Sequence, residues 1–142
     1  MIENQYIADH CQCAKLRSAT RVITRLYDDA LRPLGIKASQ FTVLVAVDLC
    51  TPISITDLSE ALSMERTTLT RNLAPLEKDG LIQMNSGKGR TRYASLTKPG
   101  KTLLAEAKPL WKSTQTKVNK SLGKDDSQTL NSILKKLKVN FN

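Results

Sequence analysis

The side chains that could do chemistry in this chain are hydroxyls and guanidiniums between positions 66 and 71. Leu69, Leu73 and Leu76 repeat at helical spacing and share one face, which we expect to pack against a core. The rest of this predicted helix presents Arg66, Thr67, Thr68, Thr70 and Arg71. Threonine and arginine suit base edges in a DNA major groove, and arginine also binds phosphate. A solvated helix surface is the ordinary alternative, because both residue types are common there.

A basic loop follows this helix. Asp79-Gly80 should end the helix, and two short apolar runs, residues 81–84 and 93–96, then flank a glycine-containing loop. This pattern predicts a hairpin whose loop carries Lys88, Arg90 and Arg92. Arginine on such a loop suits a minor groove or the phosphate backbone, where the potential is negative. Residues 65–101 contain eight cations and three anions, which favours a nucleic-acid partner.

A shorter helix is expected immediately before the threonine-rich one. Thr56 precedes an apolar stripe of Leu58, Ala61 and Leu62, and Ser63 is a suitable N-cap for the helix that follows. The order is therefore helix, turn, helix, strand, basic loop and strand.

These segments together resemble winged-helix regulators of the MarR (multiple antibiotic resistance regulator) family. The resemblance lies in QFTVLVAV, ITDLSEAL, MERTTLTRNLAPLEKDGLI and GRTRYASLTKPG, between Gln40 and Gly100. ATRVITRLYDDALRPLGI before this run and TLLAEAKPLWKSTQ after it are similar to the family's flanking helices. Wings of this family commonly read Asp-x-Arg, whereas here Lys88 precedes Arg90, so we expect a more mobile loop.

The resemblance implies a homodimer that binds pseudo-palindromic promoter DNA, usually as a repressor released by a small ligand or by oxidation. Under this hypothesis Thr67, Thr70 and Arg71 read or position the major groove, and Arg66 holds a phosphate. Arg90, with Lys88 and Arg92, engages the minor groove or the backbone. The alternative function is a winged-helix protein-interaction module without specific DNA reading.

The flanking segments predict long helices. Residues 8–34 keep a helical period as one helix, Ser39 caps a second helix, and further helices begin near residues 98 and 124. Residues 41–47 could also be read as a strand from their β-branched content. Pro109 should kink or locally break its helix. The expected fold is mainly α with a two- to three-stranded β wing: residues 1–36 and 98–142 form a helical dimerisation region, and residues 37–97 form the DNA-binding lobe.

The apolar stripes of the terminal helices exceed what a small winged-helix core can cover. We expect a two-fold dimer of interleaved helices, which would place two recognition helices about one DNA turn, roughly 34 Å, apart. Packing of residues 130–141 within their own chain is the alternative.

Composition, charge and motif content narrow the classes of protein to which this chain could belong. The 142 residues fit one domain, and the net charge of +9 suits a polyanionic partner. There is no apolar run long enough to span a bilayer and no signal-peptide pattern, so we expect a cytoplasmic chain with its three cysteines reduced. There is no phosphate-binding glycine motif and no catalytic triad pattern, so we expect neither an enzyme nor a cofactor.

His10, Cys11 and Cys13 form the one cluster of possible metal ligands. Adjacent residues of a helix point apart, so a helix-start histidine and ordinary thiols are favoured over a metal site.

The hydroperoxide-sensing branch of the family places a reactive cysteine at the position of Cys13 and one of its thiolate-contacting tyrosines at that of Tyr27. The other two tyrosine positions are Arg17 and Ala38 here, so most of that hydrogen-bonding set is lost. A neighbouring arginine, Arg17, could lower the thiol pKa.

The two sensor candidates lie about 21 Å apart along one predicted helix, so their contact would have to form across the dimer. The alternative is that Cys13 simply packs. We expect Cys50, on the apolar second helix, to lie in the core.

Overall fold

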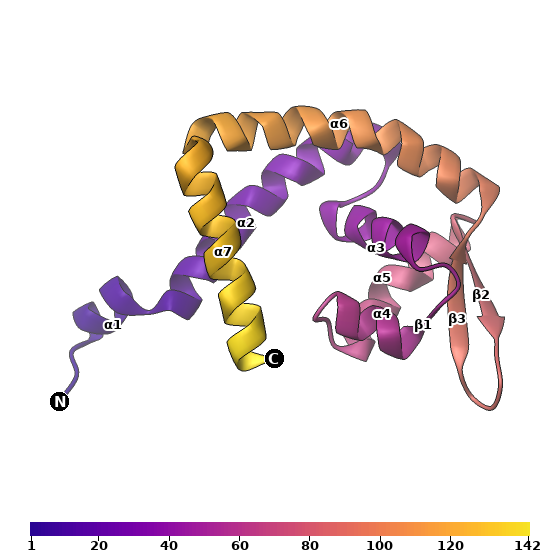
Figure 1. Cartoon of the computed structure of the whole chain (residues 1–142), viewed down its shortest axis with the longest axis horizontal. Helices are drawn as coiled ribbons and strands as arrows, with labels where there is room; N and C mark the ends of the chain where they lie inside the picture. Colours follow the sequence, from indigo (N-terminus) through magenta and orange to yellow (C-terminus); the bar gives the residue numbers. More distant parts are fainter.

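The computed structural model describes residues 1–142, and most of them are helical. Seven α-helices and one short 3-10 helix accompany a small antiparallel sheet (Figure 1). The elements are α1 (Asn4–His10), α2 (Gln12–Leu31), η1 (Arg32–Leu34), α3 (Ala38–Leu49), β1 (Ile53–Ser54), α4 (Ile55–Ala61), α5 (Arg66–Lys78), β2 (Ile82–Ser86), β3 (Arg92–Leu96), α6 (Lys98–Leu122) and α7 (Lys124–Phe141). The predicted class, mainly α with a small β wing, is confirmed. No helix combines the length and the apolar character that a membrane span needs.

The N-terminal segment does not form the single helix predicted for residues 8–34. α1 ends at His10 and α2 begins at Gln12, while Cys11 between them has an extended backbone, with φ −69° and ψ 105°. The Cys11 N–H donates to the carbonyl of Ile7, and its Sγ accepts from the backbone N–H of Ala14. Cys11 therefore ends one helix and caps the next. Periodicity alone could not reveal this break, because the apolar spacing continues across it.

α3 is a helix, as predicted, and not the competing strand. Its cap differs from the prediction, because Gln40 Oε1 accepts a hydrogen bond of 2.9 Å from the Lys37 N–H, while Ser39 already lies inside the helix. Asp28 of α2 accepts a hydrogen bond of 2.7 Å from the Ala38 N–H. This bond fixes the end of α2 against the start of α3.

α4 and α5 form the predicted helix-turn-helix, but both begin at other caps than expected. Ser54, not Thr56, caps α4, and its Oγ accepts from the Asp57 N–H at 3.0 Å. Glu65 precedes α5, whereas Ser63 lies in the turn with a left-handed φ of 49°. A residue in that conformation cannot serve as an N-cap, which needs extended backbone angles.

The wing is a hairpin of β2 and β3, with Ile82 opposite Leu96 and Ser86 opposite Arg92. The two-residue β1 pairs with the other edge of β3, so the sheet has three strands in the order β1, β3, β2.

Two prolines lie inside helices without ending them. Pro75 lies in α5 and Pro109 in α6, and both are exposed. The local break considered at Pro109 does not occur, since α6 is continuous and arches gently over the molecule (Figure 1). The backbone bond that each proline removes lies on the solvent side, while buried residues such as Leu104 hold the opposite face of α6 in place.

The core lies almost wholly in the winged-helix lobe, residues 37–97. Of fifteen buried apolar residues, only Leu31, Ile36, Leu104 and Ala107 lie outside it. The remaining helices, α1, α2, α6 and α7, form a helical arm in which α2 packs against α6, α7 turns back from the end of α6, and α1 extends away from the body (Figure 1). Neither α1 nor α7 has a buried residue.

Candidate nucleic-acid interface

α5 presents one face to solvent because its other face is anchored in the core. Leu69, Leu73 and Leu76 are 0%, 4% and 0% exposed, which confirms their predicted orientation. On the opposite side Thr67 and Arg71 are exposed. An exposed helix with small hydroxyls and an arginine has the shape and donors that a DNA major groove accepts.

A concavity of about 450 Å³ lies between α5 and the wing. Arg66, Thr70 and Glu77 line it from α5, and Arg90 and Arg92 line it from the wing loop and β3. The fold thus brings four of the predicted contact residues together from positions up to 26 residues apart in the sequence. Three guanidiniums against one carboxylate leave the concavity positively charged, which suits phosphate oxygens.

Glu77 is a functional candidate that the sequence reasoning missed. One of its carboxylate oxygens lies 4.0 Å from Nη2 of Arg92, and both side chains are about half exposed. The ion pair ties the base of the wing to α5 and reduces the positive charge of the concavity. Its position could have been found from spacing, because Glu77 follows Thr70 by seven residues and therefore shares its helix face.

The hydroxyl of Thr70 is already used within the helix. Its Oγ1 donates a hydrogen bond of 2.8 Å to the carbonyl of Arg66. The hydroxyl oxygen can still accept, and the methyl group is free for apolar contact. Thr70 therefore suits an amino group or a thymine methyl at a base edge, whereas Thr67 has no internal hydrogen bond and can both donate and accept.

The wing tip is closed by its own backbone. The Gly87 N–H donates to the carbonyl of Thr91 at 2.7 Å, and Gly89 has a left-handed φ of 66°. Lys88 and Arg90 are exposed at this tip, as predicted for a loop that reaches a groove. Arg92 differs from the prediction, because it belongs to β3 and not to the loop.

A close contact at its base holds the wing to α6. The Thr97 hydroxyl caps α6 and lies 2.5 Å from the carbonyl of Gly80 and 3.1 Å from that of Leu81. Gly100 packs so tightly here that an added Cβ would lie 2.0 Å from the Leu81 carbonyl oxygen. Only glycine fits this contact, and the wing is therefore positioned relative to α6 by backbone atoms.

Four of the eight predicted contact residues do not line the concavity: Thr67 and Arg71 on the exposed face of α5, Thr68 on its flank, and Lys88 at the wing tip. Thr68 lies on the flank of α5 away from Thr70, and its carbonyl accepts from the Asn72 side chain at 2.9 Å.

The sensor candidates are not brought together within one chain. Cys13 is exposed near the start of α2, and Tyr27 lies near the end of α2. The Tyr27 hydroxyl donates to Oε1 of Gln115 on α6 at 2.5 Å, and burial raises its pKa above the ordinary value. Cys50 is exposed just after α3, so the expectation that it lies in the core is wrong. α3 ends before this residue, which leaves its side chain outside the packed face.

No group of three or more histidine, cysteine, aspartate or glutamate side chains is arranged to hold a metal ion. His10 stacks on Tyr6 within α1, with ring centroids 4.2 Å apart, and its Nδ1 lies 2.8 Å from the Tyr6 carbonyl. It lies at the end of this helix, so the expectation of a histidine at a helix start is wrong.

A second hollow, of about 470 Å³, lies between α3 and α6. Phe41, Val45 and Trp111 give it an apolar floor, and the rings of Phe41 and Trp111 stack with centroids 6.5 Å apart. Lys108 and Lys112 also line it. The hollow lies where the helical arm meets the lobe.

Known proteins resemble this chain over both the lobe and the arm. A family model described as the MarR family matches residues 36–85. The uncharacterized HTH-type transcriptional regulator YwoH of Bacillus subtilis (strain 168) is 28% identical over 85 residues, which span 59% of this chain and 62% of that protein. The match therefore covers less than two thirds of this curated relative.

Solved structures match over nearly the full length. The transcriptional regulator MosR of M. tuberculosis, in complex with DNA, is 32% identical, with 94% of this chain and 100% of that one covered and a TM-score of 0.82. A mutant MarR from E. coli complexed with operator DNA is 25% identical, with 95% and 99% covered and a TM-score of 0.84. The helix order, the three-stranded wing and these similarities agree, and the chain belongs to the MarR family.

Proposed function

We propose that this chain is a sequence-specific DNA-binding transcriptional regulator that acts as a homodimer on pseudo-palindromic promoter DNA in the cytoplasm, most simply as a repressor. The observation that carries the proposal is the concavity between α5 and the wing, where Arg66, Thr70, Arg90 and Arg92 converge. The DNA-bound relatives, MosR and MarR, support the same interpretation.

Each contact residue has a chemical role under this proposal. Thr67 and Arg71 enter the major groove with the exposed face of α5, and Thr70 accepts from a base amino group at its edge. Thr68 contacts the backbone on the opposite flank of the helix. Arg66 holds a phosphate, while Arg90 and Lys88 reach the minor groove or the backbone from the wing. Arg92 acts closer to α5, because Glu77 holds it there.

The dimer rests on apolar surface that one chain leaves exposed. The accessible surface is 10431 Å², whereas a folded monomer of 15.8 kDa exposes about 7,300 Å². Obligate homodimers bury about 2,000 to 5,000 Å² in total, so the excess is large enough for such an interface. The exposed apolar residues of the arm include Leu16, Val22, Ile23 and Leu26 on α2 and Leu130, Ile133, Leu134 and Phe141 on α7. Residues 1–36 and 98–142 thus form the dimerisation region, and residues 37–97 form the DNA-binding lobe.

Release from DNA would follow from a change at the joint between arm and lobe. The hollow between α3 and α6 combines an apolar floor with two lysines, Lys108 and Lys112, and so fits a small molecule with an apolar body and a negative charge. Binding there would alter the spacing of the two recognition helices, with a coupling of about 1 to 3 kcal/mol.

Oxidation of Cys13 is a second possible trigger, supported by the exposure of this thiol. Since Cys13 and Tyr27 lie near opposite ends of α2, any contact between them would have to form across the dimer. Oxidant should release DNA from the wild type and not from Cys13→Ser. An equal response in both proteins would remove Cys13 from the account.

The proposed contacts are tested by two substitutions in the concavity. Arg90→Ala should weaken binding to every DNA sequence and reduce the slope of log affinity against log salt by about 1, as expected when one phosphate is no longer neutralised. Thr70→Val should weaken binding to promoter DNA more than binding to random DNA, because it removes an acceptor at a base edge. Lys37→Ala, an exposed cation of the lobe outside the concavity, is the control. If both test variants bind like the control, the proposed DNA contacts are wrong and an interaction module is favoured.

A further inference from the structure

The positive charge of this chain is concentrated on a helix that is not part of the winged-helix lobe. Residues 37–97 carry seven cations and six anions, which leaves the lobe nearly neutral. Residues 98–122, which form α6, carry six lysines and one glutamate. α6 thus supplies five of the nine net positive charges. DNA reading by α5 and the wing does not account for this charge.

Five of these lysines form a stripe along one side of α6: Lys98, Lys101, Lys108, Lys112 and Lys120. At about 100° per residue they fall within one third of the helix circumference, opposite the buried Ala107 and Thr114. All five are exposed, and neither of the two salt bridges in the structure involves a lysine. The stripe is about 33 Å long, from 22 residues at 1.5 Å each. The one acid of α6, Glu106, lies beyond its edge.

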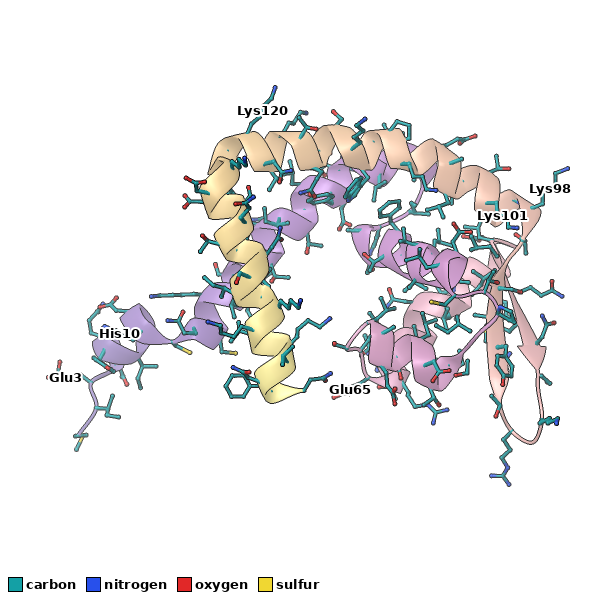
Figure 2. The ribbon with its side chains drawn as sticks, viewed as in Figure 1. Glu3, His10, Glu65, Lys98, Lys101 and Lys120 are labelled. Carbon is teal, nitrogen blue, oxygen red and sulfur yellow. The ribbon has the colours of Figure 1, made fainter.

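The two end lysines of the stripe point away from the wing tip, while Lys108 and Lys112 also border the hollow between α3 and α6. In Figure 2 the side chains of Lys98 and Lys120 project from the outer edge of α6 at its two ends, whereas the wing hairpin extends in the opposite direction. None of the five lysines lines the concavity between α5 and the wing. A duplex bound by α5 and the wing therefore leaves the stripe free.

We propose that the lysine stripe of α6 binds a second DNA duplex without sequence preference, so that one regulator dimer holds two DNA segments; this rests on the proposed function. Duplex DNA carries one negative charge per about 1.7 Å of axis, and lysines that neutralise its phosphates release counterions from it. Lysine is a mobile point charge without the planar fork of arginine, so the stripe is suited to phosphates and not to base edges. Its length of about 33 Å corresponds to one turn of the duplex.

Other occupants fit the stripe less well. A second copy of this chain would bring like charges together across a two-fold axis. A membrane-surface helix needs bulky apolar side chains beside its basic ones, whereas Thr102, Ala105, Pro109 and Thr116 lie between these lysines. An acidic membrane is therefore a contrary outcome of the test and not the proposed partner.

The experiment measures capture of a second duplex. A duplex from the chain's own promoter region is immobilised on beads, protein is added, and a fluorescent duplex of random sequence is then offered at low salt. The test variant is Lys98→Gln, Lys101→Gln, Lys120→Gln, whose residues touch neither hollow. The control variant is Lys135→Gln, Lys136→Gln, Lys138→Gln, which removes the same charge from exposed positions on α7.

The wild type and the control should capture the second duplex, and the stripe variant should capture about tenfold less while retaining the first duplex. Retention of the first duplex separates this result from a failure of DNA reading by the lobe. If the stripe variant captured as much of the second duplex as the wild type does, the two lobes of the dimer would each be binding one duplex, and the proposal would be overturned. A wild type that captures no second duplex, including one that binds vesicles containing phosphatidylserine instead, would also overturn it.

Discussion

α5 and α7 are both amphipathic helices, yet only α5 buries its apolar stripe. Leu69 and Leu76 of α5 are fully buried, whereas Leu130 and Ile133 of α7 are 41% and 49% exposed. α5 finds its partners in the same chain, in α3, α4 and β2. The lobe therefore has a core within one chain, whereas the exposed stripe of α7 is the surface that the proposed dimer would cover. The proposed function depends on both, because the arm spaces two lobes for one DNA site.

The largest effect is expected from Leu69→Ala. It leaves a cavity in the only large core of the chain and should lower the free energy of unfolding by about 2 to 5 kcal/mol. Leu130→Ala, the same change on α7, should cost less, and its cost should appear as weaker dimerisation. Urea unfolding and sedimentation equilibrium measure the two effects. Equal losses of unfolding free energy, without a change in dimerisation for Leu130→Ala, would contradict the contrast between the two helices.

Ile133→Asp should weaken dimerisation through the arm without unfolding the lobe. The charge would have to be buried in the dimer interface, so the dissociation constant should rise by about 100-fold, or about 2.7 kcal/mol. Sedimentation would then report a mass of 15.8 kDa at concentrations where the wild type has twice that mass. The circular dichroism spectrum of the variant should remain that of a mainly helical protein. A variant that stays dimeric would remove α7 from the proposed interface.

Glu77→Gln tests whether the carboxylate in the concavity lowers the affinity for DNA. It removes a carboxylate beside the proposed phosphate contacts and frees Arg92, so DNA affinity should rise about three- to tenfold at low salt. Glu60→Gln, an exposed acid of α4 outside the concavity, is the matched control. Anisotropy titration gives both values. A loss of affinity in Glu77→Gln would mean that the ion pair positions Arg92 for DNA and that this role outweighs the charge.

The smallest effect concerns the joint between α2 and α6. Because burial raises the pKa of Tyr27, the unfolded chain releases this proton first as the pH rises. The stabilising contribution is therefore fully present below the ordinary tyrosine pKa of about 10 and is lost above it. Tyr27→Phe should show a shallower fall in urea midpoint between about pH 9.5 and 11. Identical profiles would show that the Tyr27 hydroxyl does not contribute to the pH dependence of stability.

The sequence predicted the elements whose signals are local and repeated. The leucine stripe of α5 and the glycine-tipped wing were predictable, since each pattern extends over several residues. The helix N-caps were not predictable from the sequence. Ser54 and Thr56 are equally suitable cap residues by type, and only the geometry of the turn selects Ser54 for α4. The break at Cys11 was hidden by a periodicity that continues across it.

The candidate site was predictable in its residues but not in its arrangement. Arg66 and Arg90 are separated by 24 positions, and only the folded hairpin brings them to one hollow. The ion pair of Glu77 and Arg92 likewise depends on how the wing packs against α5. Charge counted along the sequence also did not show where one element ends and the next begins, because Lys98 and Lys101 already belong to α6.

The central claim is that the α5 and wing surfaces of a dimer read a DNA sequence. The most direct test is a fluorescence-anisotropy titration of the purified protein with DNA flanking its own gene and with random duplexes, at two salt concentrations. The account predicts that a preferred fragment is bound at least about 10³-fold more tightly than random DNA. Both affinities should fall as salt rises, and Arg71→Ala should reduce the preference. Equal affinity for all fragments, unchanged by Arg71→Ala, would contradict it.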